Sequence, residues 1–218
     1  MQAAAVNGYN PIWLVILSVA VALIPIFLGL FTSYLKVSIV LGILRNALGT
    51  QQIPSGLVVM ALSLAITGYC MSPVMQESLQ RAAGIKWELV GKELSPHSLV
   101  QAGQVMQPFL EFIARHAGQR EKEALTQIVS REDHKSKAEW QITLLAFLLT
   151  ELKEGFAMAF TILVPFLVID IVVANILVGL GMFMVSPVMI SLPLKILLFV
   201  VSDGWILIIK GLLNSYQI

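Results

Sequence analysis

From Phe156 to Leu180 the chain reads FAMAFTILVPFLVIDIVVANILVGL, and Asp170 is the one charged residue in it. At 1.5 Å per helical residue this stretch can cross the hydrocarbon core of a bilayer, which is about 30 Å thick. A second apolar stretch runs on to Ile209 and contains Lys195 and Asp203. A charge at bilayer depth costs about 2.5–3.5 kcal/mol unless it faces a protein interior. The pattern therefore predicts an integral membrane protein whose embedded charges have partners.

The rest of the composition agrees. Of the 218 residues, 57% are hydrophobic and only 12% are charged, whereas about 25% of an average soluble domain is charged. Two more apolar segments, residues 11–30 and 56–75, reach spanning length. Between them, residues 32–49 predict a helix that stops at Gly49, and Ser55 is placed to cap the helix that follows. We expect an all-α, multi-span membrane protein with about four long apolar helices.

A polar insert separates the second and third of these helices. Residues 77–139 hold nine of the 14 Lys and Arg, nine of the 13 Asp and Glu, and all three His. Apolar residues recur there at helical spacing, which predicts an amphipathic helix, and residues 124–129 predict a shorter one. The first set comprises Met106, Phe109, Leu110, Ile113 and Ala117. We expect three parts: N-terminal membrane helices (1–76), a small helical insert (77–139) and a C-terminal helical hairpin (140–218).

Orientation follows from Lys and Arg in short loops, which favour the cytoplasm. Lys36 and Arg45 lie after the first apolar segment. This places their loop in the cytoplasm. The N-terminus, the polar insert and the C-terminus are then expected on the periplasmic side.

The embedded charges predict contacts between helices. Lys195 and Asp203 are about 80° apart around one helix, so they do not face each other. Their partners should lie on other segments or subunits, and Glu151 is the natural candidate for Lys195. Lys195 could instead snorkel to the membrane surface. For Asp170 an interhelical pair competes with a direct ion or proton relay, although a relay usually needs several converging ionisable groups.

Several classes of site have no support in the sequence. The single cysteine, Cys70, excludes an intramolecular disulfide and is expected as a buried small hydrophobe. His97, His116 and His134 lack companions at metal-ligand spacing. No phosphate loop, nucleophile elbow or basic stripe is present. We expect no enzyme, no cofactor, no metal and no nucleic-acid partner.

The turn between the two C-terminal apolar segments contains Met182, Phe183 and Met184. Methionines in apolar chains often fill packing gaps. The alternative is a constriction, because apolar side chains repeated around a symmetric ring can close a pore by excluding water.

Two long motifs in this chain are distinctive. The first is TSYLKVSIVLGILRNALGTQQIP, from Thr32 to Pro54. The second comprises PFLVID ending at Asp170, ISLPLK ending at Lys195, and DGW beginning at Asp203. Together they resemble the SctR/FliP family of type III secretion export-gate subunits. The similarity covers residues 30–75 and 145–205, and the polar insert is not matched.

The resemblance implies a pore-forming structural subunit. Members form a pentamer that joins SctS-like and SctT-like subunits in an export gate, through which unfolded secreted proteins pass, alongside other export apparatus components. Their helices form bent hairpins, and the assembled gate projects toward the periplasm from the bacterial inner membrane. Their methionine-rich turn forms a gasket across the pore, which maps to Met182, Phe183 and Met184; the central Phe implies a stiffer ring.

Charged positions important for assembly in this family match Glu151 and Lys195. We expect Asp170 and Asp203 to share that role between subunits.

The family has a flagellar and a virulence branch. Gln51-Gln-Ile-Pro54 and the short N-terminus without a cleavable leader favour the virulence injectisome branch, with the flagellar homologue as the alternative. Two competitors come from other classes: a secondary transporter protomer, and an assembly scaffold with no pore of its own.

Overall fold

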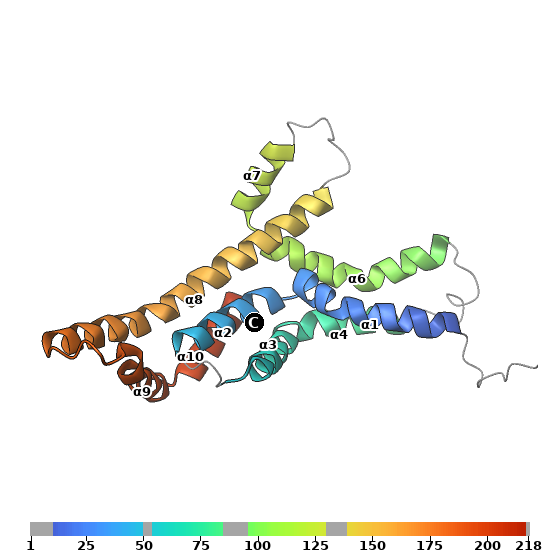
Figure 1. Cartoon of the computed structure of the whole chain (residues 1–218). Coiled ribbons are helices and arrows are strands. Elements are labelled where there is room, and N and C mark those ends of the chain that lie inside the picture. Colours follow the sequence, from blue (N-terminus) through green and yellow to red (C-terminus); the bar gives the residue numbers. More distant parts are fainter. Residues whose placement is uncertain (1–10, 50–53, 85–95, 130–138, 217–218) are drawn as a thin grey trace, which may run out of the picture.

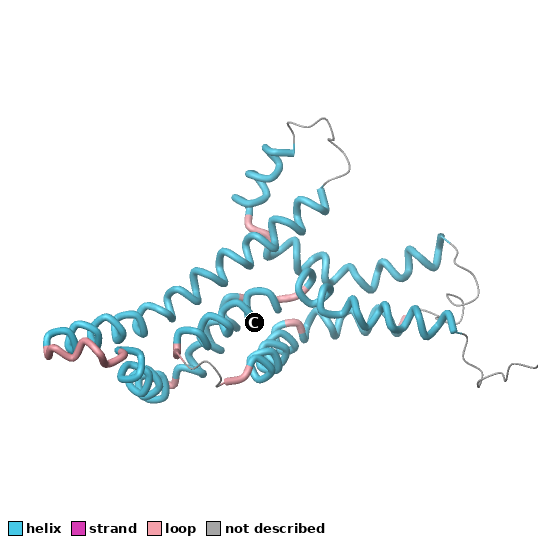
Figure 2. The backbone as a smooth tube through the Cα atoms, viewed as in Figure 1, coloured by secondary structure: helices cyan, strands magenta, loops and turns pink. Residues whose placement is uncertain are grey.

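The computed structural model describes residues 11–49, 54–84, 96–129 and 139–216. Within these ranges every regular element is a helix, which confirms the all-α class for the described part of the chain (Figures 1 and 2). The helices are α1 (Pro11–Phe31), α2 (Tyr34–Ala47), α3 (Gly56–Cys70), α4 (Ser72–Ala83), α6 (Pro96–His116), α7 (Gln119–Val129), α8 (Glu139–Gly179), α9 (Pro187–Val201) and α10 (Gly204–Ser215).

The core lies where α2 packs along α8, the most extensive helix contact in the described residues. α2 buries Val37, Val40, Leu41 and Leu44, which recur at the three- and four-residue spacing of one helix face. They pack in one cluster with Phe147 of α8 and with side chains of α3, α6 and α10. Burial of each such side chain contributes about 1.5–3 kcal/mol, so α2 is the central helix of the hydrophobic core.

The ends of α2 and α3 form as expected. Gly49 follows α2 with φ at +73°, a conformation that glycine adopts without the steric cost of a Cβ. The Ser55 side chain accepts a hydrogen bond from the backbone N–H of Val58 at 3.4 Å and so caps α3. The predicted stop and N-cap are both confirmed.

Apolar segments expected as single helices are bent. α3 and α4 meet at 64°, and α9 and α10 meet at 62°. At the first break Pro73 lies in the opening turn of α4, where a proline is tolerated because its missing N–H would be unpaired anyway. At the second break Asp203 has φ 50° and ψ 42°, a left-handed conformation that cannot continue a helix.

α8 is longer than the apolar stretch from Phe156 to Leu180. It begins at Glu139 and continues through the charged segment from Glu151 to Glu154, for 41 residues in all. Glu, Leu and Lys are strong helix formers, and Glu151 and Lys153 find partners on other helices. At about 60 Å, α8 is twice as long as a hydrocarbon core is thick. In Figure 1 it runs from the α9 side of the molecule to beside α7, and α1 and α6 extend farther on the other side.

Both predicted helices of the polar insert are confirmed. α6 buries Phe112 and Ile113, while α7 begins at Gln119, earlier than expected, and buries none of its residues. α6 packs mainly on α4, and α4 runs across the boundary expected at residue 76. The three-part division and the periplasmic location of the insert stay predictions.

Among the described residues α8 is the one helix long and apolar enough to cross a membrane. Three bent pairs pass the same criteria when their halves are taken together: Val21–Phe31 with α2, α3 with α4, and α9 with α10. The first pair bends by 87°. One span is therefore supported, and the arrangement with about four spans stays a prediction.

Candidate functional site

The turn between α8 and α9 forms the tip of a helical hairpin. The N–H of Met182 donates to the carbonyl of Leu177 at 2.9 Å, and the N–H of Gly181 donates to that of Val178 at 3.0 Å. These two bonds, with Gly181 at φ +73°, form a Schellman motif, which satisfies carbonyls at the end of α8. Ser186 is the N-cap residue of α9, and Pro187 is the first residue of that helix. The tip is thus a defined turn.

The three side chains predicted as a gasket project from this tip. Met182 is 43% exposed, Phe183 78% and Met184 102%. The described chain covers part of Met182 but leaves Phe183 and Met184 largely uncovered, although burying such side chains is favourable. The apolar surface continues down both arms of the hairpin, where the exposed residues include Ile171, Ile176, Leu180, Val188 and Met189. Exposed apolar area on this scale marks contact with other subunits or lipid.

A charge pair clamps the two arms together. Lys195 Nζ of α9 lies 2.6 Å from Asp170 Oδ2 of α8, and the Ser191 hydroxyl donates to Asp170 Oδ1 at 2.6 Å. Lys195 also donates to the carbonyl of Ala47, at the end of α2, at 3.2 Å. Asp170 therefore makes the interhelical pair expected of it. Lys195 is buried rather than snorkelling, because α2 and α8 both supply it with acceptors.

A second charge cluster lies at the middle of α8. Lys36 and Glu151 are 1% and 0% exposed, and Lys36 Nζ lies 3.0 Å from Glu151 Oε1. Lys36 also pairs with the half-exposed Glu154 at 2.7 Å. The Tyr216 hydroxyl donates a short hydrogen bond to Glu151 Oε2, and Lys36 Nζ lies 4.2 Å from the centre of the Tyr216 ring. The cluster ties α2, α8 and the end of α10 together.

This arrangement corrects two expectations. Glu151 pairs with Lys36, and Lys195 pairs with Asp170, so the expected Glu151–Lys195 contact is not made within the chain. Lys36 also loses its role in the topology argument, because a lysine buried on α2 is not a loop charge. Its position inside an apolar run was the same signal that drew attention to Lys195. Nothing in the spacing pointed to Tyr216, whose role depends on the path of α10.

Asp203 stands apart from both clusters. It is exposed at the corner between α9 and α10, and its side chain makes no capping hydrogen bond. Gly204, the next residue, packs against the Phe199 ring with no space for a Cβ. An assembly role between subunits for Asp203, as for Glu151, Asp170 and Lys195, stays a prediction.

The remaining expectations concern the histidines, the cysteine and metal binding. Among described residues no group of three His, Cys, Asp or Glu is placed to hold a metal ion. His116 accepts or donates a hydrogen bond with the Phe112 carbonyl at 2.9 Å. The side chain of His97, and His134 as a whole, lie outside what the structure describes. Cys70 is buried, as expected of a small hydrophobe.

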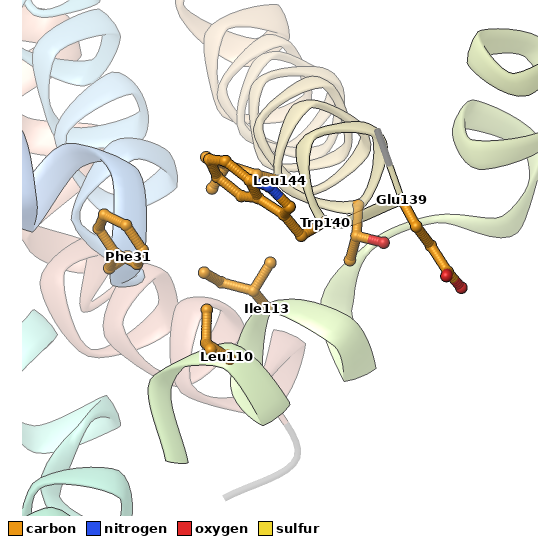
Figure 3. Close-up of a pocket in the computed structure, with 7 residues that line it drawn as sticks. Phe31, Leu110, Ile113, Glu139, Trp140 and Leu144 are labelled. Atoms are coloured by element: carbon orange, nitrogen blue, oxygen red, sulfur yellow. The ribbon is translucent and has the colours of Figure 1, made fainter. Parts of the chain in front are cut away.

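One cavity of about 440 Å³ lies between α1, α6 and the start of α8 (Figure 3). It is lined by Phe31, Leu110, Ile113, Glu139, Trp140, Thr143 and Leu144. Its walls are mostly apolar, and the single carboxylate, Glu139, has neither a second acid nor a base opposite it among the lining residues. General acid–base chemistry needs converging titratable groups, so this cavity has the character of a packing groove.

Fold and site together define a class: a protein that is helical throughout its described regular elements, with a candidate membrane span, interhelical charge pairs and an apolar hairpin tip. The sequence pattern of the FliP family matches residues 16–212. The chain belongs to the FliP family.

Three relatives illustrate the range of similarity. The chain is 36% identical to the hypersensitivity response secretion protein HrcR of Ralstonia nicotianae, over 94% of this chain and 96% of the relative. It is 34% identical to the harpin secretion protein HrcR of Erwinia amylovora, over 95% and 97%. It is 35% identical to the flagellar biosynthetic protein FliP of Bacillus subtilis, over 96% and 94%.

Proposed function

We propose that this chain is a pore-forming structural subunit of a type III secretion export apparatus in the bacterial inner membrane. Copies of it, five in the arrangement we favour, close a ring with SctS-like and SctT-like subunits, and unfolded secreted proteins pass through the ring. Membership of the FliP family and the secretion and flagellar names of the relatives support this assignment. The identities of 36% and 35% do not separate the two branches; the injectisome branch rests on Gln51-Gln-Ile-Pro54.

The observation that carries the proposal is the uncovered hairpin tip. Met182, Phe183 and Met184 are exposed on a turn held by a Schellman motif, and the arms behind it are joined by the Asp170–Lys195 pair. In a ring, repeated apolar side chains on such a turn narrow the lumen and exclude water and ions. The flexible thioethers give way when a polypeptide enters.

The structure offers less to a secondary transporter. A proton or ion relay usually needs several converging ionisable groups, whereas Lys195 is the one ion-pair partner of Asp170 among the described residues. No catalysis is proposed, and the energy for export comes from partner components.

The test replaces Met182, Phe183 and Met184 together by alanine. In the assembled complex we expect ion leakage with no loss of assembly, measured as conductance across a planar bilayer. Met189→Ala is the matched control, because Met189 is 75% exposed on α9 just beyond the turn. Unchanged conductance in a complex of normal size would reject the gasket in favour of a scaffold without a pore. The complex size is measured alongside: five chains of 23.9 kDa give a ring core of about 120 kDa.

A further inference from the structure

α10 has one buried face and one exposed face. Gly204, Ile208 and Leu212 recur every four residues and are buried against the rest of the fold. On the opposite side Ile206 is 53% and Leu207 65% exposed. The outward face of α10 therefore presents an apolar strip.

Opposite charges stand at the two ends of this strip. Asp203, at the corner just before α10, and Lys210 are seven residues apart, which is about 10 Å along the direction of the helix. Both are exposed, and within the described residues neither has an ion-pair partner closer than 4.0 Å. They are too far apart to pair with each other.

A groove runs beside the strip. A cavity of about 480 Å³ lies between α8 and α10. Its walls include Ala157 and Thr161 of α8 and Leu207 and Gly211 of α10. Ala157 and Thr161 are small residues four positions apart on α8, a spacing that lets a second helix approach closely in a membrane. The groove thus has space for side chains of a helix that lies along α10.

We propose that the outward face of α10 docks a single apolar helix of a different polypeptide of the export apparatus. That helix carries a basic residue opposite Asp203 and an acidic residue opposite Lys210, two helical turns apart, with apolar side chains between them that enter the α8–α10 groove. Charge complementarity fixes its register, since a shift by one turn leaves both charges unpaired in an apolar setting. This inference rests on the proposed function, which supplies the assembly.

A second copy of this chain fits less well. Among the apolar helices described, α10 is the one with exposed opposite charges at both ends of an apolar strip, Asp203 just before it and Lys210 within it. Two copies of α10 could pair antiparallel, Asp203 to Lys210 in both directions. That contact is two-fold and closes at two copies, so it cannot build a ring, which needs a heterologous interface.

The test uses the full chain in membranes with its secretion machinery. A photo-crosslinking amino acid replaces Leu207, and a control replaces Val172, which is 49% exposed on α8. We expect the Leu207 probe to capture one other polypeptide. Asp203→Asn, a residue that tolerates the left-handed backbone, and Lys210→Glu should each lower that yield about tenfold without lowering the Val172 yield. Reversing the matching acidic residue in the captured helix should restore the yield with Lys210→Glu.

Other outcomes overturn the proposal. These are a product of two copies of this chain, no protein product, a yield that neither substitution changes, failure of the reciprocal reversal, or an equal loss at both probe positions. Recovery in D203K/K210D with unchanged partners would instead identify the two-fold α10 contact. Secretion measured in the same strains separates this inference from the proposed function. Normal export with no Leu207 crosslinking product would reject the docking helix but not the export gate. Reciprocal rescue of crosslinking in a chain that has no role in export would reject the export gate but not the docking helix.

Discussion

Replacing Lys36 by Met should destabilise the fold by about 3–5 kcal/mol, the cost of leaving a buried charge without its partner. Glu151 is fully buried, and Lys36 is the one cation within 4.0 Å of it in the described residues. After the replacement its carboxylate keeps the hydrogen bond from Tyr216 but has no opposite charge. Loss of the contact between Lys36 and the Tyr216 ring adds about 1–2 kcal/mol at a desolvated site.

Glu151→Gln should cost less, because the cluster is asymmetric. Lys36 still has Glu154 at 2.7 Å, and the amide oxygen of Gln can still accept the Tyr216 hydrogen bond. We expect a loss of about 1–2 kcal/mol, typical of a hydrogen bond to a charged group. The double variant K36M/E151Q should be more stable than K36M alone, since no carboxylate is then left unpaired at the centre of the cluster.

The free energy of unfolding of the detergent-purified protein, from denaturant titration followed by tryptophan fluorescence, measures all three variants. Ser38→Ala on the same helix is the control for a change in α2 that removes no charge. If K36M and E151Q cost the same and their effects add in the double variant, the two charges do not interact and the cluster has been misread.

Three further results are expected. Asp170→Asn or Lys195→Met alone should each cost about 2 kcal/mol of unfolding free energy, and the double variant should cost less than their sum; strict additivity would rule out the clamp. Gly181→Ala should cost about 1–2 kcal/mol, because φ is positive there; a neutral effect in the same titration would mean that the turn rearranges freely. The hydrogen bond from Lys153 holds the pKa of the Glu121 carboxyl below its ordinary value. The ionised Glu121 carboxyl therefore stabilises α7 fully above about pH 4.3, and this stabilisation is lost as the pH falls through the lowered pKa. The rate of proteolysis in α7 should rise on acidification, and Glu121→Gln should remove that pH dependence.

Local features were predictable from sequence because their causes are local. The glycine stop at Gly49, the Ser55 cap and the apolar turn at Met182–Met184 each depend on a few neighbouring residues. The pairing of the embedded charges could not be predicted from the sequence, because periodicity shows which face of a helix is apolar but not which helix lies opposite that face. Lys36 and Glu151 are far apart in the sequence and meet only because α2 lies along α8.

The helix bends and the full length of α8 were not predicted, for a related reason. Hydropathy alone places a break at Glu151 to Glu154 and a continuous helix around Asp203. In the structure the helix continues through Glu151 to Glu154, where the residues are strong helix formers, and breaks at Asp203, where the backbone is left-handed. The charges from Glu151 to Glu154 are neutralised by residues of α2 and α7, which no window along α8 contains. The sequence therefore predicted where helices exist better than where they end.

The uninterrupted length of α8 makes it a lever arm. Partway along its length, α8 is held to the polar helices by the Lys153–Glu121 pair and by the Thr150 hydroxyl, which accepts from the N–H of Gly118, between α6 and α7, at 2.9 Å. Its far end leads into Met182–Met184. Because about 40 Å of helix lies between Lys153 and Gly179, a tilt of 5° about these contacts moves the apolar turn by about 3–4 Å. A small rotation at the polar helices thus becomes a displacement of the turn by about the width of a methyl group.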